Sequence, residues 1–177
     1  MSTISPFNWT PGCYNLKYPA TLVASNVVVW RYSVDMTYIL TGRRGEGRWE
    51  ANRPILAHGG FVDPGEDPYE TAVRELQEEV PGMKVEVDRL PFLLTPSHGM
   101  RYRWNPEARK AELTEDRAQD VPITTIEYWG EWVSGEPEAT GEAHNLRWTP
   151  VTEIIHQEND WAFNMALIIP KLIDCFF

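Results

Sequence analysis

The segment RELQEEV, residues 74–80, crowds three glutamates into five positions of a stretch with helical periodicity. At about 100° per residue, its apolar side chains fall on one arc, which predicts a helix packed against a core. That arc consists of Tyr69, Ala72, Val73, Leu76 and Val80. The glutamates form a second stripe beside the arc, where like charges three or four positions apart repel by a few tenths of a kcal/mol per pair.

The acidic stripe, Glu75, Glu78 and Glu79, has two explanations. A solvated helix face is the commoner one for a helix taken in isolation. The other is a divalent metal site, because Mg²⁺ and Mn²⁺ prefer oxygen ligands and a bound cation removes the repulsion among the carboxylates. The residues ahead of the helix decide between the two.

The predicted helix has clear boundaries. Asp67 suits the N-cap, Pro68 suits the first helical position, and Glu70 completes a capping box. Pro81 disfavours helix in the residue before it and Gly82 follows, so the helix is expected to end near Val80.

Gly59 and Gly60 lie where a predicted strand passes into the loop before this helix, and glycine lets the backbone approach a ligand or metal closely. From Gly60 the sequence reads G-x5-E-x7-R-E-L-x-E-E. This array resembles the Nudix box, the signature of the Nudix hydrolase family, over about residues 60–83. The family pattern has its next glycine at the position of Pro81, and many members have proline where this chain has His58.

The resemblance implies the Nudix fold, an α/β fold with a mixed β-sheet sandwiched between α-helices, as a single domain over residues 1–177. The later segment GEAHNLRWTPVTEI also looks like the strand-to-helix passage near the end of many members. The implied reaction is hydrolysis of a pyrophosphate bond in a nucleoside diphosphate linked to another moiety. The implied cofactor is Mg²⁺ or Mn²⁺, and the implied partner is a small-molecule nucleotide substrate.

Family positions carry over to individual residues. By position, the metal ligands are Glu75, Glu78 and Glu79, joined by a backbone carbonyl of Gly59 or Gly60. Glu66 and Arg74 correspond to residues that orient these carboxylates, so they join Glu75 and Glu79 in the predicted catalytic set. The family often draws its general base, or a further metal ligand, from an acidic residue in a loop outside the box, and Glu142 is the closest positional match. Glu136 and Glu138 are rivals, and a plain turn charge is about as common for each.

Residue type alone supports the substrate-binding candidates. Loop arginines meet phosphates and aromatic rings stack on nucleobases, although solvated arginines and packed aromatics are at least as common. The candidates are Arg44, Arg48, Trp49, His58, Tyr102 and Trp129, with Arg43, His98 and Trp104 as weaker choices.

In the family that this chain resembles, a proline past the box is associated with ADP-sugar pyrophosphatases, and a tyrosine slightly farther on with dinucleoside polyphosphate hydrolases. Pro96 and Tyr102 lie near these two places. The balance favours ADP-ribose or a related ADP-sugar or nicotinamide dinucleotide. A nucleoside triphosphate pyrophosphohydrolase is the first alternative, and a Nudix domain that senses a nucleotide without cleaving it is the second.

The remaining elements follow from periodicity and turn signals. Strands are expected over residues 22–31 and 36–42 as a hairpin, near 55–62, within 84–95, over 123–133 and at HNLRWTP. Helices are expected at VTEII and over 160–175, the latter kinked or broken at Pro170. Residues 96–121 look like a long polar loop.

The formal charge of -10 repels phosphate backbones and excludes bulk binding of nucleic acid. Two cysteines, near opposite ends, indicate neither a disulfide framework nor a zinc site. No signal peptide or membrane-spanning run is visible, so a soluble cytoplasmic protein is expected. The aromatics of residues 123–133 would suit a homodimer contact.

Overall fold

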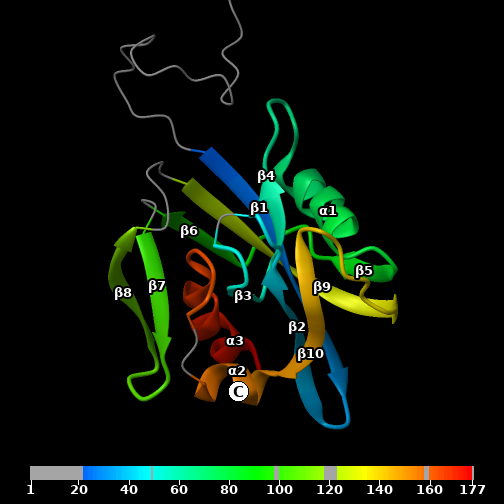
Figure 1. The fold of residues 1–177 in the computed structure, drawn as a ribbon. Coiled ribbons are helices and arrows are strands. Elements are labelled where there is room, and N and C mark those ends of the chain that lie inside the picture. The colour runs from blue at the N-terminus through cyan, green and yellow to red at the C-terminus, as the bar shows by residue number, and fades with distance from the viewer. Residues whose placement is uncertain (1–21, 49, 98–99, 118–122, 158–159, 177) are drawn as a thin grey trace, which may run out of the picture.

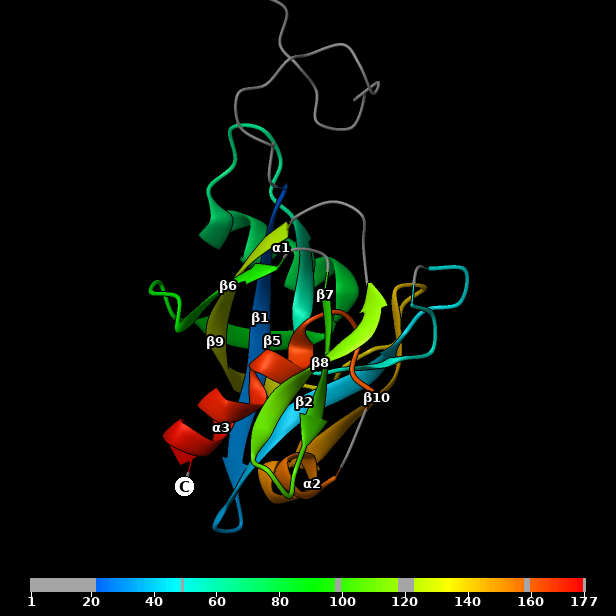
Figure 2. The same ribbon diagram turned by 90° about the vertical axis from the view of Figure 1, so that its left-hand side faces the viewer.

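The computed structural model describes residues 22–48, 50–97, 100–117, 123–157 and 160–176. A mixed sheet forms its centre, with helices on both faces (Figures 1 and 2). The predicted fold class is confirmed.

The central path of the sheet runs β10-β2-β1-β9-β5, and three short strands pair beside it. Its strands are β1 (Leu22–Ser33), β2 (Met36–Arg44), β3 (Pro54–Ile55), β4 (His58–Phe61), β5 (Met83–Val87), β6 (Leu93–Ser97), β9 (Ile123–Gly135) and β10 (Ala143–Pro150). β1 and β9 are parallel, while the other pairs are antiparallel.

One edge of β1 is shared between two partners. Residues 30–33 pair with β2, whereas residues 24–27 pair with β4. The predicted hairpin is therefore present, and its turn places Val34 and Asp35 at φ +51° and +60°. β2 pairs with β1 only from Trp30 onward, so the same edge of β1 is free for β4 over residues 24–27. This pairing brings Gly59 and Gly60 against the centre of the sheet.

Helix α1 (Pro68–Glu79) covers one face of the sheet, and its cap is the predicted one. The backbone N–H of Tyr69 donates to Oδ1 of Asp67 at 2.8 Å. Ala72 and Leu76 are buried against Val27 and Val29 of β1. The apolar arc predicted from periodicity thus faces the core and leaves the glutamates at its margin.

The opposite face is covered by α2 (Val151–His156), the 3-10 helix η2 (Met165–Leu167) and α3 (Ile169–Phe176). Figures 1 and 2 show these elements on the far side of the sheet from α1. Pro170 is the second residue of α3, where its fixed φ suits a helix start. The helix expected over 160–175 is shorter than predicted, because α3 begins only at Ile169. The break in the helical tail lies between η2 and α3, just ahead of Pro170.

The expected loop over residues 96–121 is also wrong. β7 (Met100–Asn105) and β8 (Lys110–Arg117) form a separate antiparallel hairpin beside η2 and α3. Trp104 anchors it, because its side chain is fully buried and its indole N–H donates to the carbonyl of Ile155 at 3.0 Å.

No helix within the described ranges is long and apolar enough to cross a membrane.

Candidate active site

Glu75 and Glu79 lie one turn apart on α1 and both meet the β4 backbone. Oε2 of Glu79 accepts a hydrogen bond from the N–H of Gly59 at 3.2 Å, and Glu79 is only 5% exposed. The Glu75 carboxylate lies over Gly60, where a Cβ atom would come within 2.4 Å of its Cδ. A side chain at position 60 would therefore displace this carboxylate from its place over the β4 backbone.

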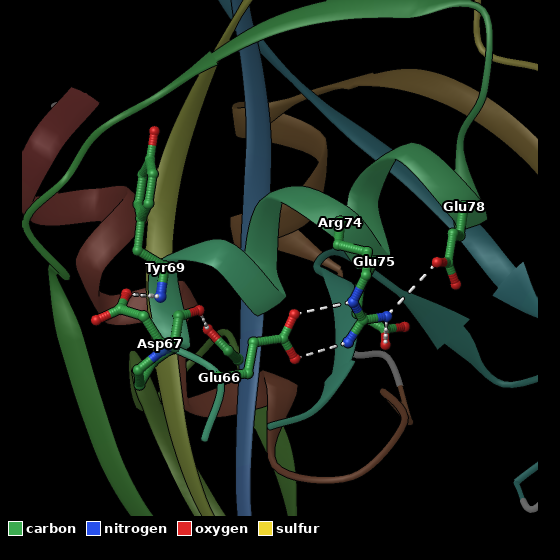
Figure 3. Close-up of polar contacts among 8 residues, drawn as sticks. Glu66, Asp67, Tyr69, Arg74, Glu75 and Glu78 are labelled. Atoms are coloured by element: carbon green, nitrogen blue, oxygen red, sulfur yellow. Dashed lines mark hydrogen bonds and ion pairs between the residues drawn. The ribbon is translucent and has the colours of Figure 1, made fainter. Parts of the chain in front are cut away.

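Arg74 holds Glu66 in a bidentate pair. Its Nε and Nη2 each donate to one carboxylate oxygen of Glu66 at 3.0 Å (Figure 3). This geometry is the strong form of the arginine–carboxylate contact. The hydrogen bonds from Arg74 lower the pKa of Glu66 to about 2. Glu66 therefore acts as a fixed anion that orients the guanidinium of Arg74.

The remaining nitrogen of Arg74 reaches the acidic stripe. Nη1 donates to Oε1 of Glu75 at 2.6 Å and lies 3.6 Å from Oε1 of Glu78, as Figure 3 shows. Burial raises the pKa of Glu75, with the charges of Glu78 and Glu79 acting in the same direction and Arg74 opposing them. The Glu78 side chain is 63% exposed. Arg74 thus relieves part of the repulsion predicted for this face.

The fit of these residues to a divalent cation can be judged from their donors. Within the described part of the chain, no three His, Cys, Asp or Glu side chains gather closely enough to form a ready-made metal cluster. Glu75 and Glu79 nonetheless present carboxylate oxygens along the Gly59–Gly60 backbone, and oxygen donors of this kind suit Mg²⁺ and Mn²⁺. The donor chemistry fits, whereas Glu78 turns toward Arg74 and solvent.

His58 lies behind the carboxylates instead of on an open surface. Its side chain is 0% exposed, and its Nδ1 lies 3.3 Å from Oε2 of Glu79. Neither ring nitrogen has a hydrogen-bond partner among the described residues. A buried imidazole in this place contacts Glu79, so a direct contact between His58 and a substrate would require a rearrangement.

The loop that carries Glu142 contacts the C-terminal end of α1. The Thr140 hydroxyl donates to the carbonyl of Glu79 at 3.1 Å, and Glu142 forms an ion pair with Arg48. Both charged side chains of that pair are close to half exposed. Burial lowers the pKa of Arg44, while the nearby charges of Glu79 and Glu142 raise it. Arg44, Arg48 and Glu142 therefore lie together at the Glu79 end of the site.

Glu136 and Glu138, the rivals of Glu142, lie instead against the turn after α1. A Cβ atom on Gly82 would come within 2.8 Å of the Glu136 carbonyl and 3.1 Å of Oε1 of Glu138. Gly82 has φ +87°, so the altered family pattern at Pro81 is accommodated by a left-handed glycine one position later.

The aromatic candidates are mostly engaged in packing. Trp129 stacks on Phe92, with ring centroids 3.8 Å apart, and Tyr102 packs against the core on the α3 face. Trp104 belongs to the core itself. Arg43 donates to the carbonyl of Asn52 at 2.6 Å. Trp49 and His98 lie outside the described residues.

Two polar residues beside the site were not anticipated from the sequence. Glu127 on β9 is 1% exposed, and its Oε1 accepts a hydrogen bond from Nδ2 of Asn26 at 3.1 Å. Burial raises the pKa of Glu127 to about 7, against the effect of hydrogen bonds from Asn26 and Thr125. The available signal was Asn26 itself, a polar residue that interrupts the apolar run LVASNVVVW.

Comparison with known proteins bears on the fold. A family model described as NUDIX domain matches residues 23–172, and no curated protein matches the chain. Similar solved structures include the NUDIX domain of Shewanella oneidensis NrtR complexed with ADP ribose, with a TM-score of 0.61 and 15% identity over 95% of this chain and 94% of that chain. A MutT protein from Methanosarcina mazei Go1 has a TM-score of 0.55 and 17% identity over 90% and 94% of the two chains. The C. elegans Ap4A hydrolase has a TM-score of 0.51 and 16% identity over 77% and 85%.

Proposed function

The chain belongs to the Nudix family of hydrolases, and from that premise we propose that it hydrolyses the pyrophosphate bond of a nucleoside diphosphate linked to another moiety. We assign ADP-ribose, or a related ADP-sugar or nicotinamide dinucleotide, as the substrate class and Mg²⁺ or Mn²⁺ as the cofactor. The observation that carries the proposal is the packing of Glu75 and Glu79 along the Gly59–Gly60 backbone.

In this proposal Glu75 and Glu79 hold the cation, with a carbonyl of Gly59 or Gly60 and with Glu78 after a change of rotamer. A bound divalent cation neutralises pyrophosphate charge and makes a water molecule more acidic. Arg74, fixed by Glu66, orients Glu75 and leaves its second oxygen available.

We assign the remaining roles, the general base and phosphate binding, to Glu142, Arg44 and Arg48. Glu142 accepts the proton of the attacking water, which requires that its ion pair with Arg48 open or shift toward the substrate. Arg44 and Arg48 bind phosphate oxygens, a contact suited to the guanidinium group. Their position at the Glu79 end of α1 supports this assignment, because the pyrophosphate must lie beside the carboxylates that hold the cation.

The choice of an ADP-ribose-like substrate rests on weaker support. Pro96 and Tyr102 stand near the family positions that distinguish substrate groups, and the NUDIX domain of S. oneidensis NrtR holds ADP ribose in the same fold. Tyr102 and Trp129 pack against the same hydrophobic cluster, so we assign both to the wall of the nucleoside site and not to an open stacking surface.

A substrate panel tests the proposal. Purified protein with Mg²⁺ or with Mn²⁺ is incubated with ADP-ribose, nicotinamide and other dinucleotides, and the common nucleoside triphosphates, and products are separated by ion-exchange chromatography. We expect AMP from ADP-ribose. Pyrophosphate release from triphosphates alone would establish the pyrophosphohydrolase alternative, and binding of ADP-ribose with no cleavage of any nucleotide would establish a sensor.

A further inference from the structure

Ser25 and Asn26 form a polar pair in the middle of the apolar strand β1. They pair with Gly60 and Gly59 of β4, respectively, so the polar pair and the double glycine lie side by side. Adjacent residues of a strand point to opposite faces of the sheet. Ser25 and Asn26 therefore contact different layers of the molecule from the same place beside the site.

Ser25 connects this place to α1. Its side chain is 0% exposed, and its hydroxyl donates to the carbonyl of Pro68, the first residue of α1, at 2.5 Å. The strand that pairs with Gly60 is thereby bonded to the helix that carries Glu75. A shift of the first turn of α1 away from β1 would break this contact.

Asn26 connects the same place to β9. Its Nδ2 donates to the buried Glu127, and its Oδ1 lies so close to Gly59 that a Cβ atom there would come within 2.7 Å of it. Gly59 in turn donates its N–H to Glu79. A continuous set of contacts therefore runs from Glu127 through Asn26 and Gly59 to a predicted metal ligand.

Burial of the Glu127 carboxyl group is energetically unfavourable. Its Oε2 is buried and has no hydrogen-bond partner among the described residues, and burial without a partner costs free energy. An apolar side chain of similar size would fill the same space without that cost. Glu127 accepts hydrogen bonds from Asn26 and Thr125, and of these two Asn26 is the one that contacts Gly59.

We propose that Ser25 and Asn26, the latter held by Glu127, are positioning residues that set the Gly59–Gly60 backbone against the carboxylates of α1. This inference rests on the proposed metal site, to which it assigns supporting residues. These residues touch neither cation nor substrate, and they act through Gly59, Gly60 and the first turn of α1.

The test is direct Mn²⁺ binding to folded protein by calorimetric titration, combined with the NMR shift and hydrogen exchange of the Gly59 amide in metal-free protein. Loss of residues that orient metal ligands weakens metal affinity roughly 10- to 100-fold. We expect a loss of this size in Asn26→Ala and Ser25→Ala, with faster exchange of the Gly59 amide in Asn26→Ala. Thr41→Val is the matched control, because it removes the buried hydroxyl that contacts Thr149 at 2.6 Å, away from β4.

Two substitutions of Glu127 keep the test decisive even where Asn26→Ala fails to fold. Glu127→Gln retains an acceptor for Asn26, whereas Glu127→Met fills the space without one and removes a buried carboxyl group. We expect Glu127→Gln to bind Mn²⁺ as the unmodified protein does and Glu127→Met to bind it at least about 10-fold more weakly.

Wild-type Mn²⁺ affinity and an unchanged Gly59 amide in Asn26→Ala would overturn the inference. Equal weakening in Thr41→Val would also overturn it, because the effect would then be a general loss of sheet stability. If Glu79→Gln binds Mn²⁺ as tightly as the unmodified protein, the proposed metal site fails, and the Gly59 amide of metal-free protein still decides whether Asn26 positions this backbone.

Discussion

At the scale of single residues, Arg74 explains how α1 carries its acidic stripe. One guanidinium contacts Glu66 through two nitrogens and Glu75 through a third. For the helix taken alone, the sequence allowed a solvated face, and the glycines ahead of it favoured a metal site. The structure separates its members, because Glu78 is largely exposed while Glu75 and Glu79 contact the backbone of β4.

Replacing Arg74 by lysine tests this role. Lysine keeps the charge but cannot hold both oxygens of Glu66 and one of Glu75 together. We expect Arg74→Lys to lower kcat roughly 10- to 100-fold with a smaller change in KM. NMR titration should show the pKa of Glu66 moving up from about 2 toward its ordinary value of 4.5. An unchanged kcat would remove Arg74 from the set of positioning residues.

Glu127 gives a prediction about stability and pH. Its pKa is about 7 in the folded protein against 4.5 ordinarily, so the protonated form favours folding. This contribution to stability is complete below pH 4.5 and is lost as the pH rises through 7. The lost amount is about 3 kcal/mol, from a shift of about 2.5 units at 1.36 kcal/mol each.

Urea unfolding of Glu127→Gln and the unmodified protein between pH 4 and pH 8 measures this effect. The variant cannot ionise at position 127, so its free energy of unfolding should rise relative to that of the unmodified protein across this range. Parallel stability curves for the two proteins would contradict the assignment of a raised pKa to Glu127.

At the scale of elements, the contact of β4 with α1 forms the site, and Gly60 sets the distance between them. A methyl group at position 60 would overlap the Glu75 carboxylate. We expect Gly60→Ala to displace Glu75 and lower kcat at least about 10-fold. Gly141→Ala is the control for stability, since a Cβ atom there has nothing within 4 Å. Full activity in Gly60→Ala, measured as AMP release, would show that Glu75 is not needed in its present place.

The sequence predicted the elements whose signals are local. The β-branched runs on either side of residues 33–35 predicted the β1–β2 hairpin, and Asp67 and Pro68 predicted the start of α1. The β7–β8 hairpin was missed because its charged residues resemble a loop. Tyr102 and Trp104 alternate with arginines there, and this period of two is the strand signal that charge obscured.

The candidate site also contains residues that a local pattern predicted and residues that it did not. Glu75, Glu79, Glu66 and Arg74 lie within one short segment, so a local pattern was enough to bring them together. The contact between Asn26 and Glu127 joins positions 101 residues apart, and only the parallel pairing of β1 with β9 places them side by side. Contacts of this kind follow from strand order, which residue types do not specify.

At the scale of the whole molecule, the net charge of -10 and the acidic stripe predict that a divalent cation stabilises the fold. A ligand that binds only the folded state adds about 2.7 kcal/mol at a concentration 100 times its Kd. We therefore expect Mn²⁺ to raise the Tm of the unmodified protein and EDTA to reverse the rise. An equal rise in Glu79→Gln would place the stabilising cation elsewhere. The single domain over 1–177, the homodimer and the cytoplasmic location remain predictions.

The most direct measurement of the central claim is AMP release from ADP-ribose by the unmodified protein and by Glu79→Gln, each with Mg²⁺ and with EDTA. We expect release only from the unmodified protein with Mg²⁺, and a fall of at least about 100-fold in Glu79→Gln, because removing a metal ligand should cost no less than removing the residues that orient it. Circular dichroism of the variant confirms that it is folded. Release that persists in EDTA, or a folded Glu79→Gln with a near-normal kcat, would contradict the claim that the α1 carboxylates form a metal-dependent hydrolytic site.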